Sequence, residues 1–180
     1  EILGKRELWH TVRVAITAIT PSLGHIMNTH IRLDLREQRR ITTAELASEL
    51  DMPPDRVERQ LHRARKATVS AATALALARS SRADACGVLD GLLADILSEE
   101  QRRAGRELVL TAEQSKKVTA HATTCGKCDR RASAAGKYVL WAIGPGLLII
   151  TDDEERRRII AALFNRADAN VASGVRPMLF

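Results

Sequence analysis

Aromatic residues are scarce in this chain of 180 residues, which has two tryptophans, one tyrosine and two phenylalanines. β-Sheets are rich in aromatic and β-branched residues, whereas alanine, leucine and arginine, which are abundant here, favour helices. A chain of this length holds one or two small domains with modest cores. The composition therefore predicts an all-α fold.

Disulfide and membrane signals are also missing. The chain has only three cysteines, and two of them are close together in the sequence, unlike the even, widely spaced framework of a secreted disulfide protein. The most apolar run, residues 138–150, is too short for a membrane helix and is broken by Gly144-Pro145-Gly146. No signal peptide precedes the first predicted helix. These absences predict a cytoplasmic protein that does not bind a membrane.

Catalytic motifs are absent as well. The sequence shows no paired carboxylates in an apolar setting, no Ser-His-Asp order and no glycine-rich phosphate loop. We therefore predict that the protein is not an enzyme.

A possible metal site stands out among the residues that are present. The run His121-Ala-Thr-Thr-Cys125-Gly-Lys-Cys128 has the pattern His-x3-Cys-x2-Cys, and the remaining cysteine, Cys86, lies 35 residues upstream. Three cysteines and one histidine are a tetrahedral ligand set for Zn(II), which favours thiolate and imidazole donors. The spacings i,i+4 and i,i+3 predict that the three clustered donors share one face of a helix, with Cys86 closing the site from another helix.

Two other interpretations of these residues stay open. Cys125 and Cys128 can form a redox-active Cys-x-x-Cys pair, or the three cysteines can be small apolar residues without a ligand. Asp84 and Asp129 are alternative donors, because Cys86 lies far from the other ligands in the sequence.

Charge is unevenly distributed along the chain, whose net charge is +6. Residues 1–82 contain 14 Lys and Arg against 9 Asp and Glu, whereas residues 83–180 contain 14 against 13. The basic first half suggests contact with phosphate, although the same excess occurs on ordinary solvated surfaces.

Apolar residues recur with helical spacing through this first half. They predict one helix over residues 8–19 and a second over 22–36, and His30 falls on the apolar side of the second. His25 and His30 fall in the second helix, and neither has a cysteine or carboxylate cluster beside it. We expect both histidines at the surface or at an edge, and not as metal ligands.

A helix-turn-helix is predicted next along the chain. The segment Thr42-Thr-Ala-Glu45 has the pattern of a capping box and begins a short helix over 44–50. Asp51-Met-Pro-Pro54 forces a turn, and a longer helix without Gly or Pro can extend over 55–79. A short helix, a tight turn and a longer basic helix are typical of DNA-binding proteins.

The longer helix carries the candidate DNA-binding residues. Val57, Leu61 and Ala64 would face the partner helix. Arginine pairs with guanine edges, glutamine with adenine, and basic side chains reach phosphates, although a solvated helix face has the same composition. The outward-facing candidates are Arg56, Arg59, Gln60, Arg63 and Lys66.

The segment from Ile41 to Arg65 resembles the helix-turn-helix of bacterial sigma factors that reads the promoter −35 element. The resemblance rests on Glu45-Leu46-Ala47, Val57 and Leu61-His62-Arg63-Ala64-Arg65, and it covers about residues 8–80. The pattern departs from the family at Pro53-Pro54-Asp55, where the recognition helix begins. It also departs at residues 21–28, which lack the usual Arg-Glu pair.

The second half resembles the zinc-binding module of anti-sigma factors, in which a Cys or His on one helix joins a His-x3-Cys-x2-Cys motif on another. Sigma factors of the extracytoplasmic-function group, some with such a module fused behind the −35 domain, are similar over almost the whole chain. The resemblance implies a helix-turn-helix domain at 1–80 and a zinc-stapled helical domain at 83–180. It also implies that a domain that binds the −10 element precedes residue 1.

The resulting functional expectation is the C-terminal part of an alternative sigma factor. Its implied partners are RNA polymerase core and promoter DNA, with a −10-binding sigma domain or another regulator as further candidates. The alternatives are an anti-sigma-like binding module and a transcription regulator that senses redox state through Cys125 and Cys128. The segment Thr151-Asp-Asp-Glu154 is a second capping box, and the helix after it is expected to pack on the core or to dock another chain.

Overall fold

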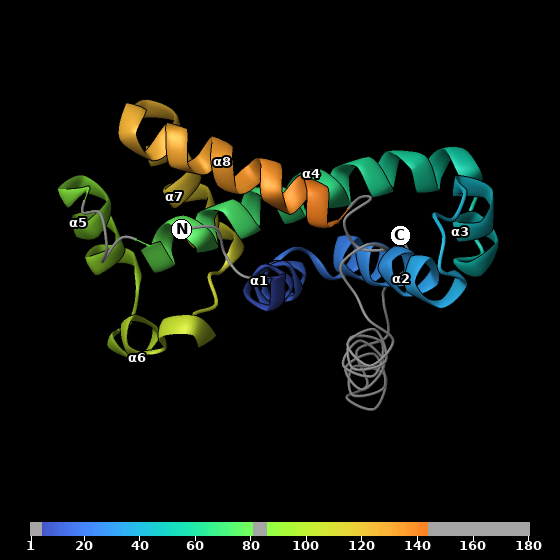
Figure 1. The fold of residues 1–180 in the computed structure, drawn as a ribbon, viewed down its shortest axis with the longest axis horizontal. Coiled ribbons are helices and arrows are strands. Elements are labelled where there is room, and N and C mark those ends of the chain that lie inside the picture. The colour runs from blue at the N-terminus through green and yellow to red at the C-terminus, as the bar shows by residue number, and fades with distance from the viewer. Residues whose placement is uncertain (1–4, 81–85, 144–180) are drawn as a thin grey trace.

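The computed structural model describes residues 5–80 and 86–143, and in these residues it contains helices and no strand. The predicted all-α class is confirmed (Figure 1). The elements in order are α1 (Lys5–Ala18), α2 (Pro21–Glu37), α3 (Thr43–Glu49), α4 (Pro54–Ser80), α5 (Gly87–Ile96), α6 (Glu99–Arg103), the 3-10 helix η1 (Gly105–Glu107), α7 (Ala112–Thr124) and α8 (Gly126–Ala142).

Local sequence signals account for the first four helices. Pro21 occupies the first turn of α2, where no amide donor is required. The capping box that begins α3 is formed as predicted, with the Thr42 hydroxyl accepting from the Glu45 N–H and the Glu45 carboxylate accepting from the Thr42 N–H. Asp51 adopts a positive φ of 50° in the turn between α3 and α4, which reverses the chain within a few residues.

Helix α4 is the axis of the molecule and passes through both of its hydrophobic clusters (Figure 1). The first cluster joins α1, α2, α3 and the larger, N-terminal part of α4. The second cluster joins the end of α4 to α5, α7 and the start of α8. Helix α8 and the residue after it reach back to the first cluster through Val139 and Ile143, so the half with the cysteines packs directly on the half that contains α1, α2 and α3.

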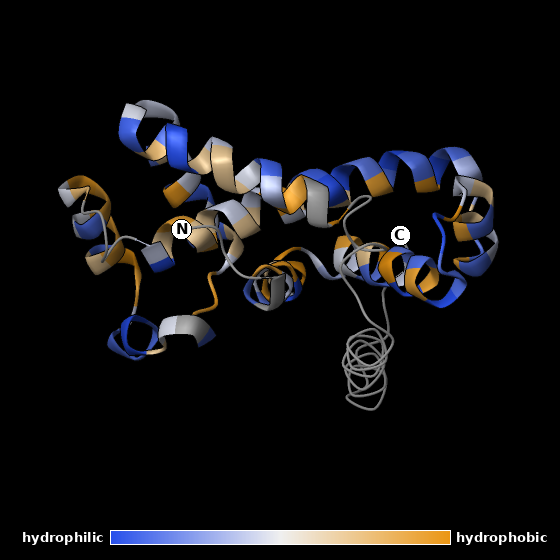
Figure 2. Ribbon diagram, in the orientation of Figure 1, coloured by the Kyte–Doolittle hydropathy of each residue, from blue (hydrophilic) through white to orange (hydrophobic). Residues whose placement is uncertain are grey.

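Hydropathy follows this arrangement. In Figure 2 the hydrophobic residues of α2 and of the first half of α4 form patches between longer hydrophilic stretches, as expected for helices with one buried side. No described helix has the length and apolarity that a membrane span requires. Of the apolar run at 138–150, only 138–143 is described, and there Tyr138 and Leu140 are exposed. The predicted capping box at 151–154 and the helix after it lie outside the described residues.

The expectation for His30 is wrong. His25 is exposed as predicted, but His30 is only 4% exposed and lies in the interior of the half that contains α1, α2 and α3. Its burial depends on partners on its own helix and on α4, which are described with the site below.

Candidate metal centre and nucleic-acid interface

The structure brings together all four residues of the predicted metal site. Cys86 precedes the first turn of α5, His121 lies in the last turn of α7, Cys125 follows α7, and Cys128 lies in the first turn of α8. Their donor atoms all lie within 4.8 Å of one another. Asp129 is exposed and is not part of this cluster, and Asp84 lies outside the described residues.

The prediction that one helical face carries three of the donors is wrong. Helix α7 ends at Thr124, and Cys125 has an extended conformation, with φ −110° and ψ 106°. The chain therefore bends at Cys125 and starts a new helix at Gly126. The bend lets Cys125 and Cys128 approach His121 from a second direction, which a tetrahedral centre requires and one straight helix does not provide.

The distances between donors fit a metal ion. Tetrahedral bonds of about 2.3 Å to sulfur and about 2.0 Å to nitrogen place two sulfurs about 3.8 Å apart and a sulfur and a nitrogen about 3.5 Å apart. In the structure, Cys86 Sγ lies 3.8 Å from Cys125 Sγ and 3.5 Å from His121 Nε2. The three cysteines and the histidine thus form a cluster that can hold a metal ion.

The local environment shifts the pKa values of Cys125 and Cys128 in opposite directions. A hydrogen bond from the backbone of Cys128 lowers the pKa of Cys125, which favours its thiolate. Burial raises the pKa of Cys128 to about 12, and its side chain has no exposed surface. Cys128 therefore needs a nearby cation if it is to lose its proton, and a bound metal ion supplies one.

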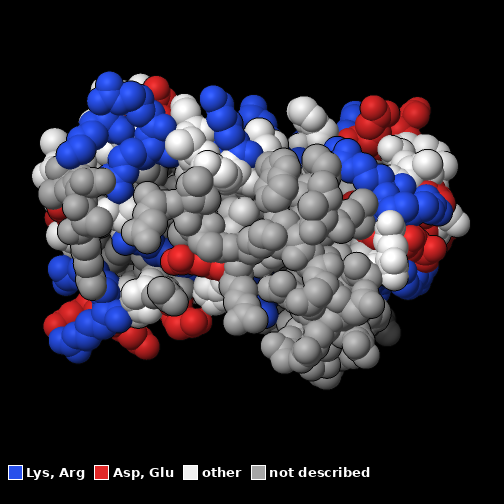
Figure 3. Space-filling view, in the orientation of Figure 1, with Lys and Arg blue, Asp and Glu red and all other residues white. Residues whose placement is uncertain are grey.

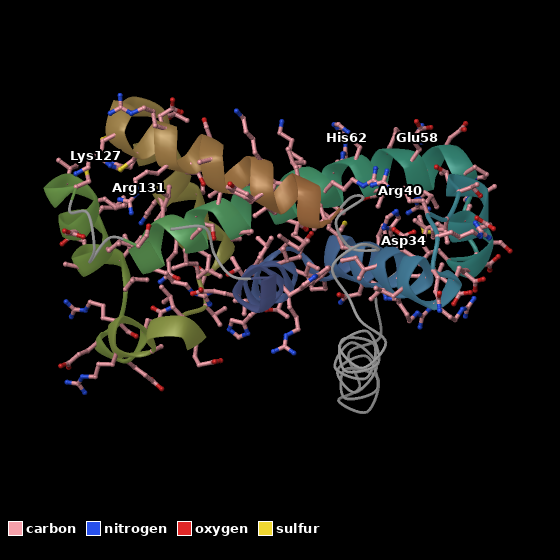
Figure 4. The ribbon with its side chains drawn as sticks, in the orientation of Figure 1. Asp34, Arg40, Glu58, His62, Lys127 and Arg131 are labelled. Carbon is pink, nitrogen blue, oxygen red and sulfur yellow. The ribbon has the colours of Figure 1, made fainter. Side chains whose placement is uncertain are left out.

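Two arginine side chains make hydrogen bonds around the end of α4, and one of them, Arg131, links it to the half with the cysteines. Arg131, one turn after Cys128 on α8, donates to the carbonyl of Ser80 at the end of α4, at 3.0 Å. Arg79 donates to the hydroxyl of Thr11 on α1 at 2.9 Å and to the carbonyl of Leu108 at 3.3 Å. Figure 4 shows Arg131 beside the end of α4 and Lys127 farther out, near α5. The cluster is thus fixed to the C-terminal end of α4.

The candidate DNA-binding residues lie as the spacing predicts. Val57, Leu61 and Ala64 are buried against the other helices. The outward side of α4 presents four exposed cations together with the half-buried Gln60; the cations are Arg56, Arg59, Arg63 and Lys66. The first turns of α4 thus display a basic, solvent-accessible surface.

Ion pairs fix α3 beside this surface. Arg32 on α2 donates to the Glu49 carboxylate at 2.7 Å. Arg39 makes a two-pronged contact with the carboxylate of Glu45 and lowers the pKa of Glu45 to about 2. The short helix is therefore held at both of its ends, which sets its position against α4.

A buried polar network, which the sequence reasoning missed, joins α2, α4 and the loop before α3. Arg65 donates to His30 Nε2 at 3.0 Å, so the proton of the neutral imidazole is on Nδ1, which faces Asp34 Oδ2 at 3.6 Å. Asp34 Oδ1 accepts from the N–H of Ile41 at 2.9 Å. Arg40 lies near Asp34 between α2 and α4 (Figure 4).

Burial controls the charge of this network. It lowers the pKa of His30 to about 4, the neighbouring Asp34 carboxylate opposes that shift, and the cations of Arg65 and Arg40 add to it. His30 is therefore neutral near pH 7. Asp34 stands four residues after His30, and this spacing is the signal by which the sequence could have shown that the histidine has a partner on its own helix.

Comparison with known proteins adds no family to these observations. No protein family model matches the chain, and no curated protein or solved structure matches it. A functional interpretation therefore depends on the residues and geometry described above.

Proposed function

We propose that this chain is the C-terminal part of an alternative sigma factor, which binds the −35 element of promoters and RNA polymerase core, with a Zn(II)-binding module that regulates it in cis. The observation that carries the proposal is the outward basic side of α4, directly after the capped helix α3 and a tight turn. This is the arrangement in which a recognition helix enters the major groove of DNA.

The DNA part of the proposal leads to a specific expectation. Arg59→Ala or Arg63→Ala should weaken binding to the preferred duplex by about 1–3 kcal/mol if the lost arginine contacts a base in a bidentate manner. The preferred sequence is first selected from random duplexes, and affinities are then measured for that sequence and for a scrambled one. Glu58→Gln on the same helix is a control for changes that do not remove a cation.

Two results would contradict the DNA part. One is that selection returns no preferred sequence. The other is that both alanine variants keep the wild-type ratio between the affinities for selected and scrambled DNA. The polymerase part is tested separately, by whether the chain binds purified RNA polymerase core.

Zn(II) is the proposed occupant of the cluster of three cysteines and one histidine. Thiolate and imidazole donors at these distances suit this ion, and a site with four protein ligands is typical of structural zinc. The cluster is attached to the end of α4 through Arg131. The module can therefore influence the position of α4.

A second candidate function is redox sensing through Cys125 and Cys128, whose sulfurs belong to a cluster of donor atoms that all lie within 4.8 Å of one another. Loss of the metal would leave these thiols close enough to form a disulfide after a small approach. Mass spectrometry after mild peroxide treatment distinguishes the two functions. In a sensor, low peroxide is reduced to water while the two thiols lose two hydrogen atoms and the metal is released, whereas a structural site stays loaded.

A further inference from the structure

Helix α8 carries a second row of cations beside those of α4. Arg130 and Lys137 are both exposed and are separated by two helical turns, so they lie on nearly the same side of α8, about 10 Å from each other along its axis. Arg59 and Lys66 have the same spacing on α4 and are also exposed. The two helices thus repeat one pattern of outward positive charge.

Packing places α8 on α4 directly after the segment of α4 that carries Arg59 and Lys66. Gly136 on α8 lies against Thr73 and Val69 of α4, with ordinary van der Waals separations of 3.6 and 3.9 Å from the position of a Cβ. Thr73 and Val69 continue, one to two turns onward, the side of α4 on which Lys66 stands. One side of α4 is therefore open to solvent in its first half, where Arg59 and Lys66 lie, and is covered by α8 in its second half.

The direction of α8 makes the rows continuous. Its start lies near the C-terminal end of α4, and its end lies near the middle of α4, so the two helices run in opposite directions (Figure 1). Lys137 is accordingly closer to Lys66, and Arg130 is farther along. In Figure 3 blue surface recurs along the upper edge, over the start and the middle of α8, and appears again over α4 on the right, where red surface lies beside it.

These four cations are available to an external anion. Within the described part of the chain, none of the four takes part in an ion pair. The exposed carboxylate next to the row on α8, Asp129, lies about 100° around the helix from Arg130. The surface therefore has the sign and the linear spread of a site that follows a nucleic-acid backbone.

We propose that α8 extends the DNA-binding surface, and that Lys137 and Arg130 contact the phosphate backbone next to the segment bound by α4. The inference rests on the proposed function, because it assumes that the open side of α4 meets DNA. It assigns to the metal-binding half a direct, sequence-independent share of affinity. Phosphate contacts position a protein on the duplex, whereas base contacts provide its specificity.

The test is the salt dependence of DNA binding by the full metal-loaded chain. The probe is a mixed-sequence duplex of about 30 base pairs, titrated between about 50 and 200 mM KCl, a range over which each lost phosphate contact lowers the slope of log K against log salt by about 0.9. We compare Arg130→Gln/Lys137→Gln with Arg59→Gln/Lys66→Gln. Arg103→Gln is the control, because Arg103 is an exposed cation paired with Glu99 on α6, on the other side of the molecule from α8 (Figure 1).

We expect Arg130→Gln/Lys137→Gln to lower the slope by about 2 units, and Arg59→Gln/Lys66→Gln to lower it by about 1 unit if Arg59 contacts a base and by about 2 if it contacts a phosphate, while Arg103→Gln keeps the wild-type slope. If the α4 pair lowers the slope and the α8 pair behaves like Arg103→Gln, the extension along α8 is refuted and the DNA-binding role of α4 survives. If neither pair changes the slope, the proposed function fails and the extension fails with it. A loss of sequence preference in the α8 pair would also overturn the inference, since backbone contacts lower affinity equally for all sequences.

Discussion

Replacing Cys128 by serine is expected to abolish metal binding and to loosen the half of the molecule around α5 and α7. Serine supplies no thiolate, and the side chain at this position has no exposed surface through which another donor could enter. A ligand present at about 1,000 times its dissociation constant stabilises the folded state by about 4 kcal/mol, and the variant loses this contribution. Metal content is measured by native mass spectrometry, with one Zn(II) per chain expected for the wild type.

The loss of stability in Cys128→Ser should be confined to the half of the molecule that contains the cysteines. Cys86, Cys125 and Cys128 belong to or pack against the second hydrophobic cluster, whereas α2 and α3 contribute only to the first. Hydrogen exchange should therefore accelerate in α5 and α7 and stay slow in α2. Chelation of the wild-type metal should give the same pattern, because it removes the same bonds.

Asp129→Asn is the matched control, since this exposed carboxylate follows Cys128 but is not in the cluster. It should keep a full equivalent of metal and the wild-type exchange pattern. Retention of one metal ion per chain in Cys128→Ser would show that the site has a different ligand set.

The sequence predicted the helices of the first half well, because the signals for them are local. The capping box at Thr42 and Glu45, the prolines before α4 and the apolar spacing of Val57, Leu61 and Ala64 all lie within a few residues of what they determine. Such patterns identify helix limits and buried sides without knowledge of the rest of the chain.

The four residues of the candidate metal site were also predictable, but their arrangement was not. The donor types and spacings pointed to Cys86, His121, Cys125 and Cys128, and the structure brings these four together. The spacing i,i+4 and i,i+3 fits a continuous helix equally well, so nothing local showed that the chain bends at Cys125. The bend brings donors from α7, α8 and the start of α5 around one point, and this tertiary arrangement is not encoded in the local spacing.

The burial of His30 was not predicted from the sequence. Its position placed it on the apolar side of α2, but its polarity suggested a surface or edge. Burial is possible because Arg65, on a different helix, donates to the imidazole and because Asp34 lies beside it. Buried polar groups are tolerated only where the fold supplies their hydrogen bonds. The sequence of α2 alone does not show that Arg65, 35 residues away, supplies one to His30.

The same network gives the last prediction, which concerns stability in acid. The pKa of His30 falls from about 6.5 in the unfolded chain to about 4 in the folded one, mainly through burial. Between these values the unfolded state binds a proton that the folded state does not, so the free energy of unfolding should fall as the pH falls from about 6.5 to 4. The contribution of the neutral His30 to the free energy of unfolding is fully present above about pH 6.5. Acidification to about pH 4 removes on the order of 3 kcal/mol of it.

Denaturant unfolding at about pH 7 and about pH 4.5 measures this effect, with His30→Gln compared with the wild type. The variant is expected to be less stable at neutral pH, because glutamine does not reproduce the contacts with Arg65 and Asp34, but to lose less stability on acidification. Other titrating groups, including the metal ligands, are common to both proteins and cancel in the difference. His25→Gln, which changes an exposed histidine on the same helix, should follow the wild-type pH dependence. Parallel pH curves for His30→Gln and the wild type would contradict the prediction, because they would mean that the pKa of His30 is the same in the folded and the unfolded chain. A wild type that gains stability on acidification relative to His30→Gln would also contradict it, because His30 would then be protonated in the folded protein, with Asp34 as its counter-ion.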